Sequence, residues 1–97
     1  MRDDQLTNPA IWPLVQQENQ RQLEKWGIQD HSPFEWMAFI TEEVGEMAEA
    51  ISECHYRGGT LEDVTKEAIQ AATLCLKVAE MYLNAQIFDT GYLGPDP

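Results

Sequence analysis

Basic residues are scarce in this chain. Among its 97 residues, six are Lys or Arg and 17 are Asp or Glu, which gives a formal net charge of −11. A chain of this charge is repelled by the phosphate backbone of nucleic acids and by anionic membrane surfaces, so we expect neither as a partner. A phosphorylated small molecule is not excluded, because a divalent cation can bridge its phosphates to protein carboxylates.

Long apolar runs and closely spaced cysteines are also missing. No segment reaches the roughly 18 apolar residues of a membrane span, and the N-terminus carries no apolar run of signal-peptide length. Cys54 and Cys75 are too few for a disulfide scaffold, and we interpret both as reduced thiols of the core. These absences predict a soluble cytoplasmic protein.

The chain further lacks strand patterns, internal repeats and low-complexity segments, so it predicts one all-α domain over residues 1–97. Residues 1–9 are polar and end in a turn signal, and we expect them to be loosely held. A first helix is expected from about Ala10, or from Pro13 if that proline occupies the first turn, to about Trp26. Gly27 then provides the C-terminal stop.

Capping signals delimit two more helices. Residues 32–35, Ser-Pro-Phe-Glu, predict a capping box with proline in the first helical position, so the second helix should start there and run to about His55 or Tyr56. The Arg-Gly-Gly of residues 57–59 breaks the pattern. Thr60 is positioned to cap a third helix that runs to about Leu83.

The predicted apolar stripes of these helices are thin, which favours self-association. In the second helix the stripe is formed by Ile40, Val44, Met47 and Ile51, and in the third by Val64, Ala68, Ala71, Ala72, Cys75, Ala79 and Leu83. Three such helices cannot enclose a core alone, and Phe39, Leu74 and Met81 would stay uncovered, as would a C-terminal arm over residues 84–97. We therefore predict a four-helix-bundle-type core formed by homo-oligomerisation, as a homodimer or a dimer of dimers.

The second helix also carries an acidic face. Glu42, Glu46, Glu49 and Glu53 fall within one narrow sector, and Glu43 lies nearer the apolar boundary. Like charges at this spacing repel one another by roughly a few tenths of a kcal/mol per pair. The pattern has two interpretations, a solvated acidic surface or a site for a hard cation.

The third helix supplies the counterpart that a cation site needs. Mg²⁺ prefers oxygen ligands, and ligand pairs at i,i+3 on two antiparallel helices can hold it. Glu43 and Glu46 form one such pair. Glu67 and Gln70 form the other, in which Gln70 offers a neutral carbonyl oxygen.

Two amides lie within the inward stripe of the first helix. Asn19 and Gln22 share that stripe with Val15 and Trp26. They either form hydrogen bonds across a helix interface or line a polar cavity that holds a ligand.

Four stretches resemble those of the MazG-like all-α nucleoside triphosphate pyrophosphohydrolases. Residues 42–46, Glu-Glu-Val-Gly-Glu, and residues 67–70, Glu-Ala-Ile-Gln, resemble the EExxE…ExxD signature of that family. Residues 21–29, RQLEKWGIQ, resemble its RQxxKWGxQ stretch, and residues 31–36 resemble the loop that precedes its acidic helix. The resemblance covers residues 18–83.

The resemblance implies a Mg²⁺-dependent enzyme, with Mn²⁺ as a substitute ion, that hydrolyses a nucleoside triphosphate to a monophosphate and pyrophosphate. It implies these metal ligands: Glu43, Glu46, Glu67 and Gln70. Glu42 and Glu43 would be the catalytic acids. Lys25 would contact phosphate, and the base would be held by Gln22, Trp26, His31 and Trp36.

One departure from the signature leaves a second function open. Gln70 stands where the signature has an aspartate, and one carboxylate fewer weakens Mg²⁺ binding. The alternative is a non-catalytic helical module, binding a nucleotide or a protein, that has lost turnover through Gln70. The base-binding residues have structural alternatives as well, with Trp26 and Trp36 as core aromatics and His31 as an exposed loop residue.

Overall fold

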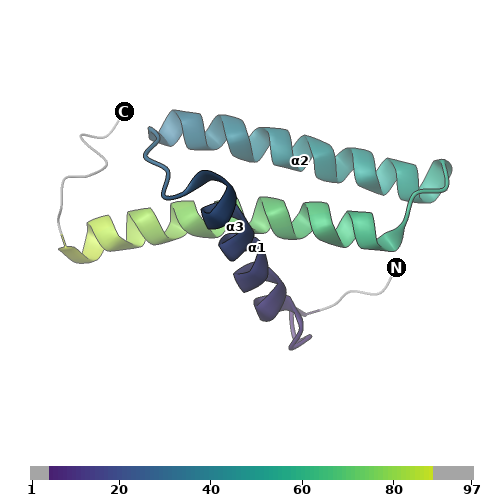
Figure 1. The fold of residues 1–97 in the computed structure, drawn as a ribbon, viewed down its shortest axis with the longest axis horizontal. Helices are drawn as coiled ribbons and strands as arrows, with labels where there is room; N and C mark the ends of the chain where they lie inside the picture. The colour runs from purple at the N-terminus through teal and green to yellow at the C-terminus, as the bar shows by residue number, and fades with distance from the viewer. Residues whose placement is uncertain (1–4, 89–97) are drawn as a thin grey trace.

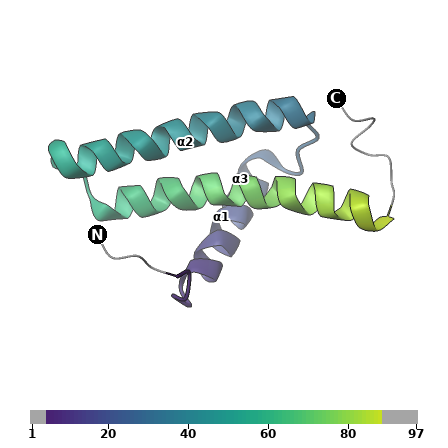
Figure 2. The same ribbon diagram turned by 180° about the vertical axis from the view of Figure 1, so that it is seen from behind.

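The computed structural model describes residues 5–88, which form three helices and no strand. They are α1 (Ile11–Trp26), α2 (Pro33–Tyr56) and α3 (Leu61–Phe88). α2 and α3 run antiparallel and side by side, and α1 crosses α3 steeply (Figure 1). From the opposite side α1 lies behind α3, so α1 covers only one face of the α2–α3 pair (Figure 2). The predicted all-α class is confirmed.

The first two helices lie where the sequence predicts them, whereas α3 is longer. It continues to Phe88 instead of ending near Leu83, because residues 84–88 contain neither glycine nor proline. The first five residues of the predicted C-terminal arm are therefore helical. Residues 89–97 of that arm, and residues 1–4 of the predicted loose segment, lie outside the described residues.

Local hydrogen bonds set the ends of α2 and α3. Ser32 Oγ accepts from the Glu35 backbone N–H at 3.2 Å, and Glu35 Oε1 accepts from the Ser32 N–H at 3.0 Å, which confirms the capping box. Thr60 Oγ1 accepts from the backbone N–H of Asp63 at 3.1 Å. In the turn before it, a Cβ on Gly59 would stand 2.9 Å from a backbone carbon of α2. A larger residue would force the two helices apart at this turn.

α3 buries a different face from the one that its apolar pattern predicts. Of the predicted stripe, Ala71 is buried and Val64 and Ala68 are half-buried. Its other members are exposed: Ala72, Cys75, Ala79 and Leu83. Thr73 and Leu74 are buried instead, because α1 and α2 pack on the side of α3 that carries them. The stripe prediction is wrong within this chain, and so is the assignment of Cys75 to the core.

In α2 as well, the buried side differs from the predicted apolar stripe. Val44 and Ile51, which were expected inside, are 44% and 42% exposed. Trp36 is 4% exposed and is the buried residue of this helix. The side chains that were expected to stay uncovered are covered within the chain, since Leu74 is buried and Phe39 and Met81 are half-buried. The other two members of the predicted stripe, Ile40 and Met47, are half-buried, so the inner side of α2 coincides with that stripe only in part.

The described residues bury little apolar surface. Four apolar side chains among them are buried: Val15, Trp36, Ala71 and Leu74. The radius of gyration is 15.6 Å, whereas a compact domain of this length has about 12 Å. The three helices thus form an open arrangement rather than a closed core. None of the helices in residues 5–88 is long and apolar enough to cross a membrane.

Candidate functional site

Three carboxylates from two helices converge on one point. Glu43 and Glu46 stand one turn apart on α2, and Glu67 faces them from α3 because the two helices lie side by side. One carboxylate oxygen from each lies within 4.8 Å of the other two. Glu43 and Glu67 are half-buried and Glu46 is exposed, so the cluster opens to solvent at one edge. The structure therefore brings together the three predicted carboxylate ligands.

The proximity of these groups disfavours their charged forms. Burial raises the pKa of the Glu43 carboxyl, and the neighbouring charges of Glu46 and Glu67 raise it further. The pKa of Glu67 is raised by its own burial and then by the charge of Glu46. A cation among the three would remove this repulsion.

Gln70 joins the carboxylates to one another. Its amide nitrogen donates to Glu43 Oε2 at 3.1 Å and to Glu67 Oε2 at 3.0 Å, in the orientation that does not set the amide oxygen against two acceptors. Gln70 is half-buried on the inner side of α3. In this arrangement Gln70 acts as a donor that holds two carboxylates. To become a metal ligand it would have to turn its carbonyl oxygen inward.

A cavity of about 240 Å³ adjoins the carboxylates. Glu42, Glu43 and Gln70 form one side of it, and Phe39 and Leu74 add apolar surface. The α1 residues of the lining are Arg21, Gln22 and Trp26, with Gln29 following in the loop. The cavity thus combines acidic, amide and aromatic surfaces from all three helices.

A buried polar network attaches α1 to α3 beside this cavity. Gln22, which is 4% exposed, donates from Nε2 to Glu18 Oε2 at 2.6 Å and accepts from Lys77 Nζ of α3. Glu18 is 8% exposed and also accepts from Arg21 Nε at 2.8 Å and Nη2 at 2.7 Å. Gln22 forms a hydrogen bond across a helix interface, as one of the two interpretations predicts, and it also lines the cavity.

Glu18 is charged despite its burial. Burial alone would raise the pKa of its carboxyl, but the hydrogen bonds from Arg21 and Gln22 outweigh it and hold the pKa below the usual value. Burial lowers the pKa of the Lys77 ammonium, and the nearby Glu18 charge opposes that change. No role was predicted from the sequence for Glu18 or Arg21. Their i,i+3 spacing, and the i,i+4 spacing of Glu18 and Gln22, were the available signals.

The predicted base and phosphate residues do not all reach one cavity. Trp26 lines the cavity at the carboxylates and is 50% exposed. Lys25 is not among the residues that line it, and its Nζ stands 4.7 Å from the centroid of the Trp26 ring. His31 and Trp36 line a different cavity of about 310 Å³, formed with Val78, Met81 and Tyr82 of α3.

His31 and Trp36 form an aromatic cluster with Phe39. The ring centroids of His31 lie 5.4 Å from Trp36 and 4.9 Å from Phe39, both edge to face. No described residue forms a hydrogen bond with His31 Nε2 or Trp36 Nε1, and both atoms are buried. Phe39 is part of the wall of the cavity at the carboxylates, so this cluster contributes residues to both cavities.

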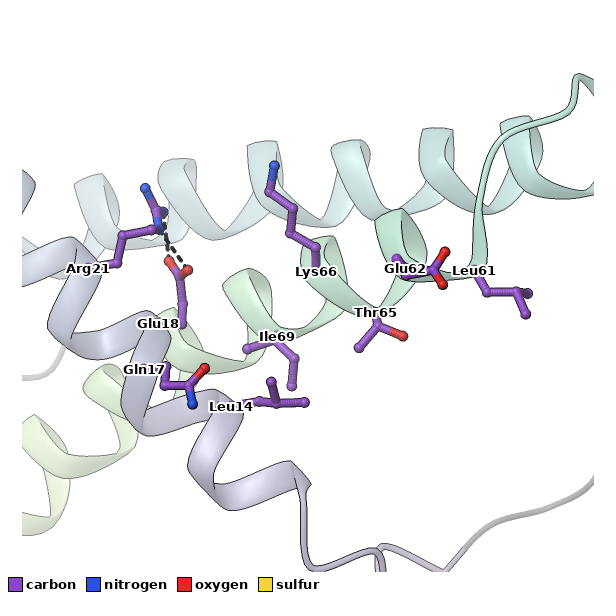
Figure 3. Close-up of a pocket in the computed structure, with 9 residues that line it drawn as sticks. All are labelled: Leu14, Gln17, Glu18, Arg21, Leu61, Glu62, Thr65, Lys66 and Ile69. Atoms are coloured by element: carbon purple, nitrogen blue, oxygen red, sulfur yellow. Dashed lines mark hydrogen bonds and ion pairs between the residues drawn. The ribbon is translucent and has the colours of Figure 1, made fainter.

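A larger groove of about 490 Å³ runs between the first half of α1 and the start of α3 (Figure 3). Leu14, Ile69 and Leu61 give it an apolar floor, and the Arg21–Glu18 pair stands at one end. None of the three clustered carboxylates lines this groove. We assign the candidate site to the smaller cavity, because that is where the carboxylates lie.

In comparisons with known proteins, the chain matches no family model, no curated protein and no solved structure. The fold and the site therefore define a three-helix, all-α protein with a carboxylate cluster. The resemblance to the MazG-like family rests on the motifs of residues 21–29, 42–46 and 67–70.

Proposed function

We propose that this protein is a Mg²⁺-dependent nucleoside triphosphate pyrophosphohydrolase that removes unwanted nucleotides from the cellular pool. The observation that carries the proposal is the convergence of Glu43, Glu46 and Glu67 within 4.8 Å, beside a cavity of about 240 Å³. The same three residues occupy the metal-binding positions of the family signature that the sequence resembles.

The donor set suits Mg²⁺. All three groups offer hard carboxylate oxygens, which Mg²⁺ prefers over nitrogen or sulfur ligands. Mg²⁺ binds oxygens at about 2.0–2.1 Å, so neighbouring ligand oxygens stand about 3 Å apart and opposite ones about 4 Å. Oxygens that already lie within 4.8 Å of one another reach this spacing through small side-chain rotations.

Each part of the site has a task in this reaction. Glu43, Glu46 and Glu67 would hold Mg²⁺, which when bound withdraws charge from the phosphates of the substrate. Glu42, which lines the cavity next to Glu43, is the candidate to orient a water molecule and take its proton. The water oxygen forms a bond to phosphorus as the bond to the bridging oxygen breaks, and pyrophosphate leaves.

The base of the nucleotide would lie against α1. Trp26 and Phe39 offer aromatic faces in the cavity, and stacking on them tolerates different bases. Gln22 retains one free amide N–H after its bonds to Glu18 and Lys77, so it can donate once to a base. In this arrangement His31 and Trp36 support the wall through Phe39, or bind a part of the substrate that extends into their own cavity.

The alternative is a nucleotide-binding module without turnover. The assigned orientation of Gln70, in which its amide nitrogen donates to Glu43 and Glu67, favours this alternative, since an amide in that orientation offers no oxygen to a metal. Pyrophosphate release separates the two functions. Under the enzymatic function, Mg²⁺ or Mn²⁺ supports release from at least one nucleotide of a canonical and modified panel, and EDTA abolishes it.

Variants of the cluster complete this test. Glu67→Gln and Glu46→Gln should abolish both turnover and the rise in melting temperature with Mg²⁺, while Glu49→Gln on the outer acidic face should change neither. For the wild type, Mg²⁺ at a hundredfold excess over its dissociation constant should add about 2.7 kcal/mol to the free energy of unfolding. Nucleotide binding without any turnover would establish the module instead, and an equal Mg²⁺ response in all four proteins would refute the metal site.

We also propose that the chain self-associates through the face of α2 and α3 that α1 leaves uncovered. Met37, Val44 and Ile51 of α2 are exposed apolar residues in one sector of that helix. On α3, the exposed apolar residues that share one sector are Ala72, Ala79 and Leu83. Two copies joined through these two sectors would form a four-helix layer.

A further inference from the structure

We infer that Arg21 is the side chain that binds the phosphate chain of the substrate, and that Glu18 is the residue that positions it. The inference rests on the proposed function and assigns to Arg21 the role that the family resemblance gives to Lys25. No role was predicted from the sequence for Glu18, or for Arg21, which begins the RQLEKWGIQ stretch.

The first observation is the place of Arg21. It is the only cation among the described residues that line the cavity at the carboxylates. Arg21 and Glu43 line this cavity together. The pKa of the Arg21 guanidinium is raised, first by its hydrogen bond to Glu18 and then by the charges of Glu18, Glu43 and Glu67. A nucleotide whose phosphates reach a cation held by Glu43 and Glu67 would therefore also reach Arg21.

The second observation is the orientation of the guanidinium. The Glu18 carboxylate accepts from Nε and Nη2 at 2.8 and 2.7 Å, which fixes one edge of the planar group (Figure 3). These bonds use two of the five N–H groups, and no described residue accepts from Nη1. The Arg21 side chain is 45% exposed, so the unused N–H groups are accessible to a ligand. The remaining N–H groups are held in a planar arrangement that matches the geometry of phosphate oxygens.

The third observation is that Glu18, which holds Arg21, is itself held in place. Glu18 is 8% exposed and is held by Gln22, which is held in turn by Lys77 of α3. Burying a carboxylate costs free energy unless its charge is compensated. If the Arg21–Glu18 pair only attached α1 to the rest of the fold, an exposed pair would do so at a lower cost in free energy. The burial sets the direction of Arg21 relative to α3, the helix that carries Glu67.

Lys25 lacks each of these features. Its ammonium lies over the Trp26 ring at 4.7 Å, and Lys25 does not line the cavity. An ammonium on a flexible stem also offers no planar pair of donors. The charge of Arg21 is offset by Glu18, so its contribution to the substrate is directed hydrogen bonding rather than net charge.

The test compares KM and kcat for pyrophosphate release in five variants, together with binding of the α,β-methylene analogue of the same nucleotide in the presence of Mg²⁺. Arg21→Gln should raise KM and the dissociation constant of the analogue on the order of tenfold, with Mg²⁺ affinity unchanged. Arg21→Lys should recover only part of this loss, because lysine keeps the charge and loses the fork. Glu18→Gln should raise KM in the same direction by about threefold.

The fourth variant is the matched control. Arg57→Gln removes an arginine that pairs with Glu53 at 2.9 Å at the far end of α2, and it should leave KM unchanged. A lower melting temperature with wild-type KM in both Arg21 variants would mean that Arg21 only fastens α1, and would overturn the inference. A rise in KM for Lys25→Gln in place of Arg21→Gln would overturn it as well.

The same measurements distinguish failure of the proposed function from failure of the inference about Arg21. If the wild type binds the analogue without turnover, the enzymatic function fails, and the dissociation constants of the Arg21 variants still decide the inference. If the wild type neither releases pyrophosphate nor binds the analogue, both are refuted.

Discussion

The half-buried Glu43 carboxylate makes stability depend on pH in a direction opposite to that of a paired acid. Its pKa is raised in the folded chain by burial and by Glu46 and Glu67, so the folded state holds the proton more tightly than the unfolded state. The charged form therefore costs stability. This cost is absent below the unfolded pKa of about 4.3, and it grows as pH rises from there through the raised folded value.

In EDTA, Glu43→Gln should accordingly melt at a higher temperature than the wild type at pH 7.5, and the difference should shrink as the pH falls toward 4. The pKa of Glu18 is lowered in the folded chain, so its stabilising effect is lost as pH falls. This loss is shared by the wild type and Glu43→Gln, so it does not change the difference between them. Thermal melts followed by circular dichroism across this range provide the measurement. Glu49→Gln is the control on the outer face, and a Glu43→Gln variant that is less stable than the wild type at pH 7.5 would contradict the prediction.

At the scale of a single element, the start of α2 depends on the capping box. Ser32→Ala removes the acceptor for the Glu35 N–H, which bonds at 3.2 Å, and leaves an unsatisfied donor in the first turn. The loss should be about 1 kcal/mol, which corresponds to a fall in melting temperature of about 4–8 °C for a domain of this size.

Glu35→Gln is the matched variant for this cap. Glutamine can still accept from the Ser32 N–H, which now bonds to Glu35 at 3.0 Å, so this change should lower the melting temperature less than Ser32→Ala does. Equal losses in the two variants would show that the carboxylate charge, rather than the Ser32 hydroxyl, determines the strength of the cap.

At the scale of the whole molecule, the uncovered apolar face predicts a homo-oligomer. Val44 is 44% exposed at the centre of this face, and a charge placed there should oppose association of two copies. Light scattering should therefore give a dimer or larger assembly for the wild type and a lower mass for Val44→Glu. Ala38→Glu, at an exposed position of α2 outside this sector, should keep the wild-type mass. A monomeric, well-folded wild type at micromolar concentration would refute self-association.

Local signals made the helices predictable from the sequence. The bounds of α1 and α2 follow from Gly27, Ser32 and Glu35, because caps depend on hydrogen bonds between residues that are close along the chain. The Glu43–Glu46 pair is equally local, since i,i+3 spacing places both on one side of a helix. Glu67 could be added because α2 and α3 are joined by a short turn and must run antiparallel.

The tertiary structure alone decided which faces are buried and which α1 residues reach the site. A helical pattern marks an apolar stripe but does not say whether that stripe packs within the chain or against a second copy. In α3 the regular stripe with Ala72 and Ala79 is exposed, while Gln70, Thr73 and Lys77 face the other helices. α1 crosses α3 steeply (Figure 1), and Arg21, held by Glu18, lines the cavity that Glu43 also lines. Nothing in the local spacing of a helix specifies a crossing angle.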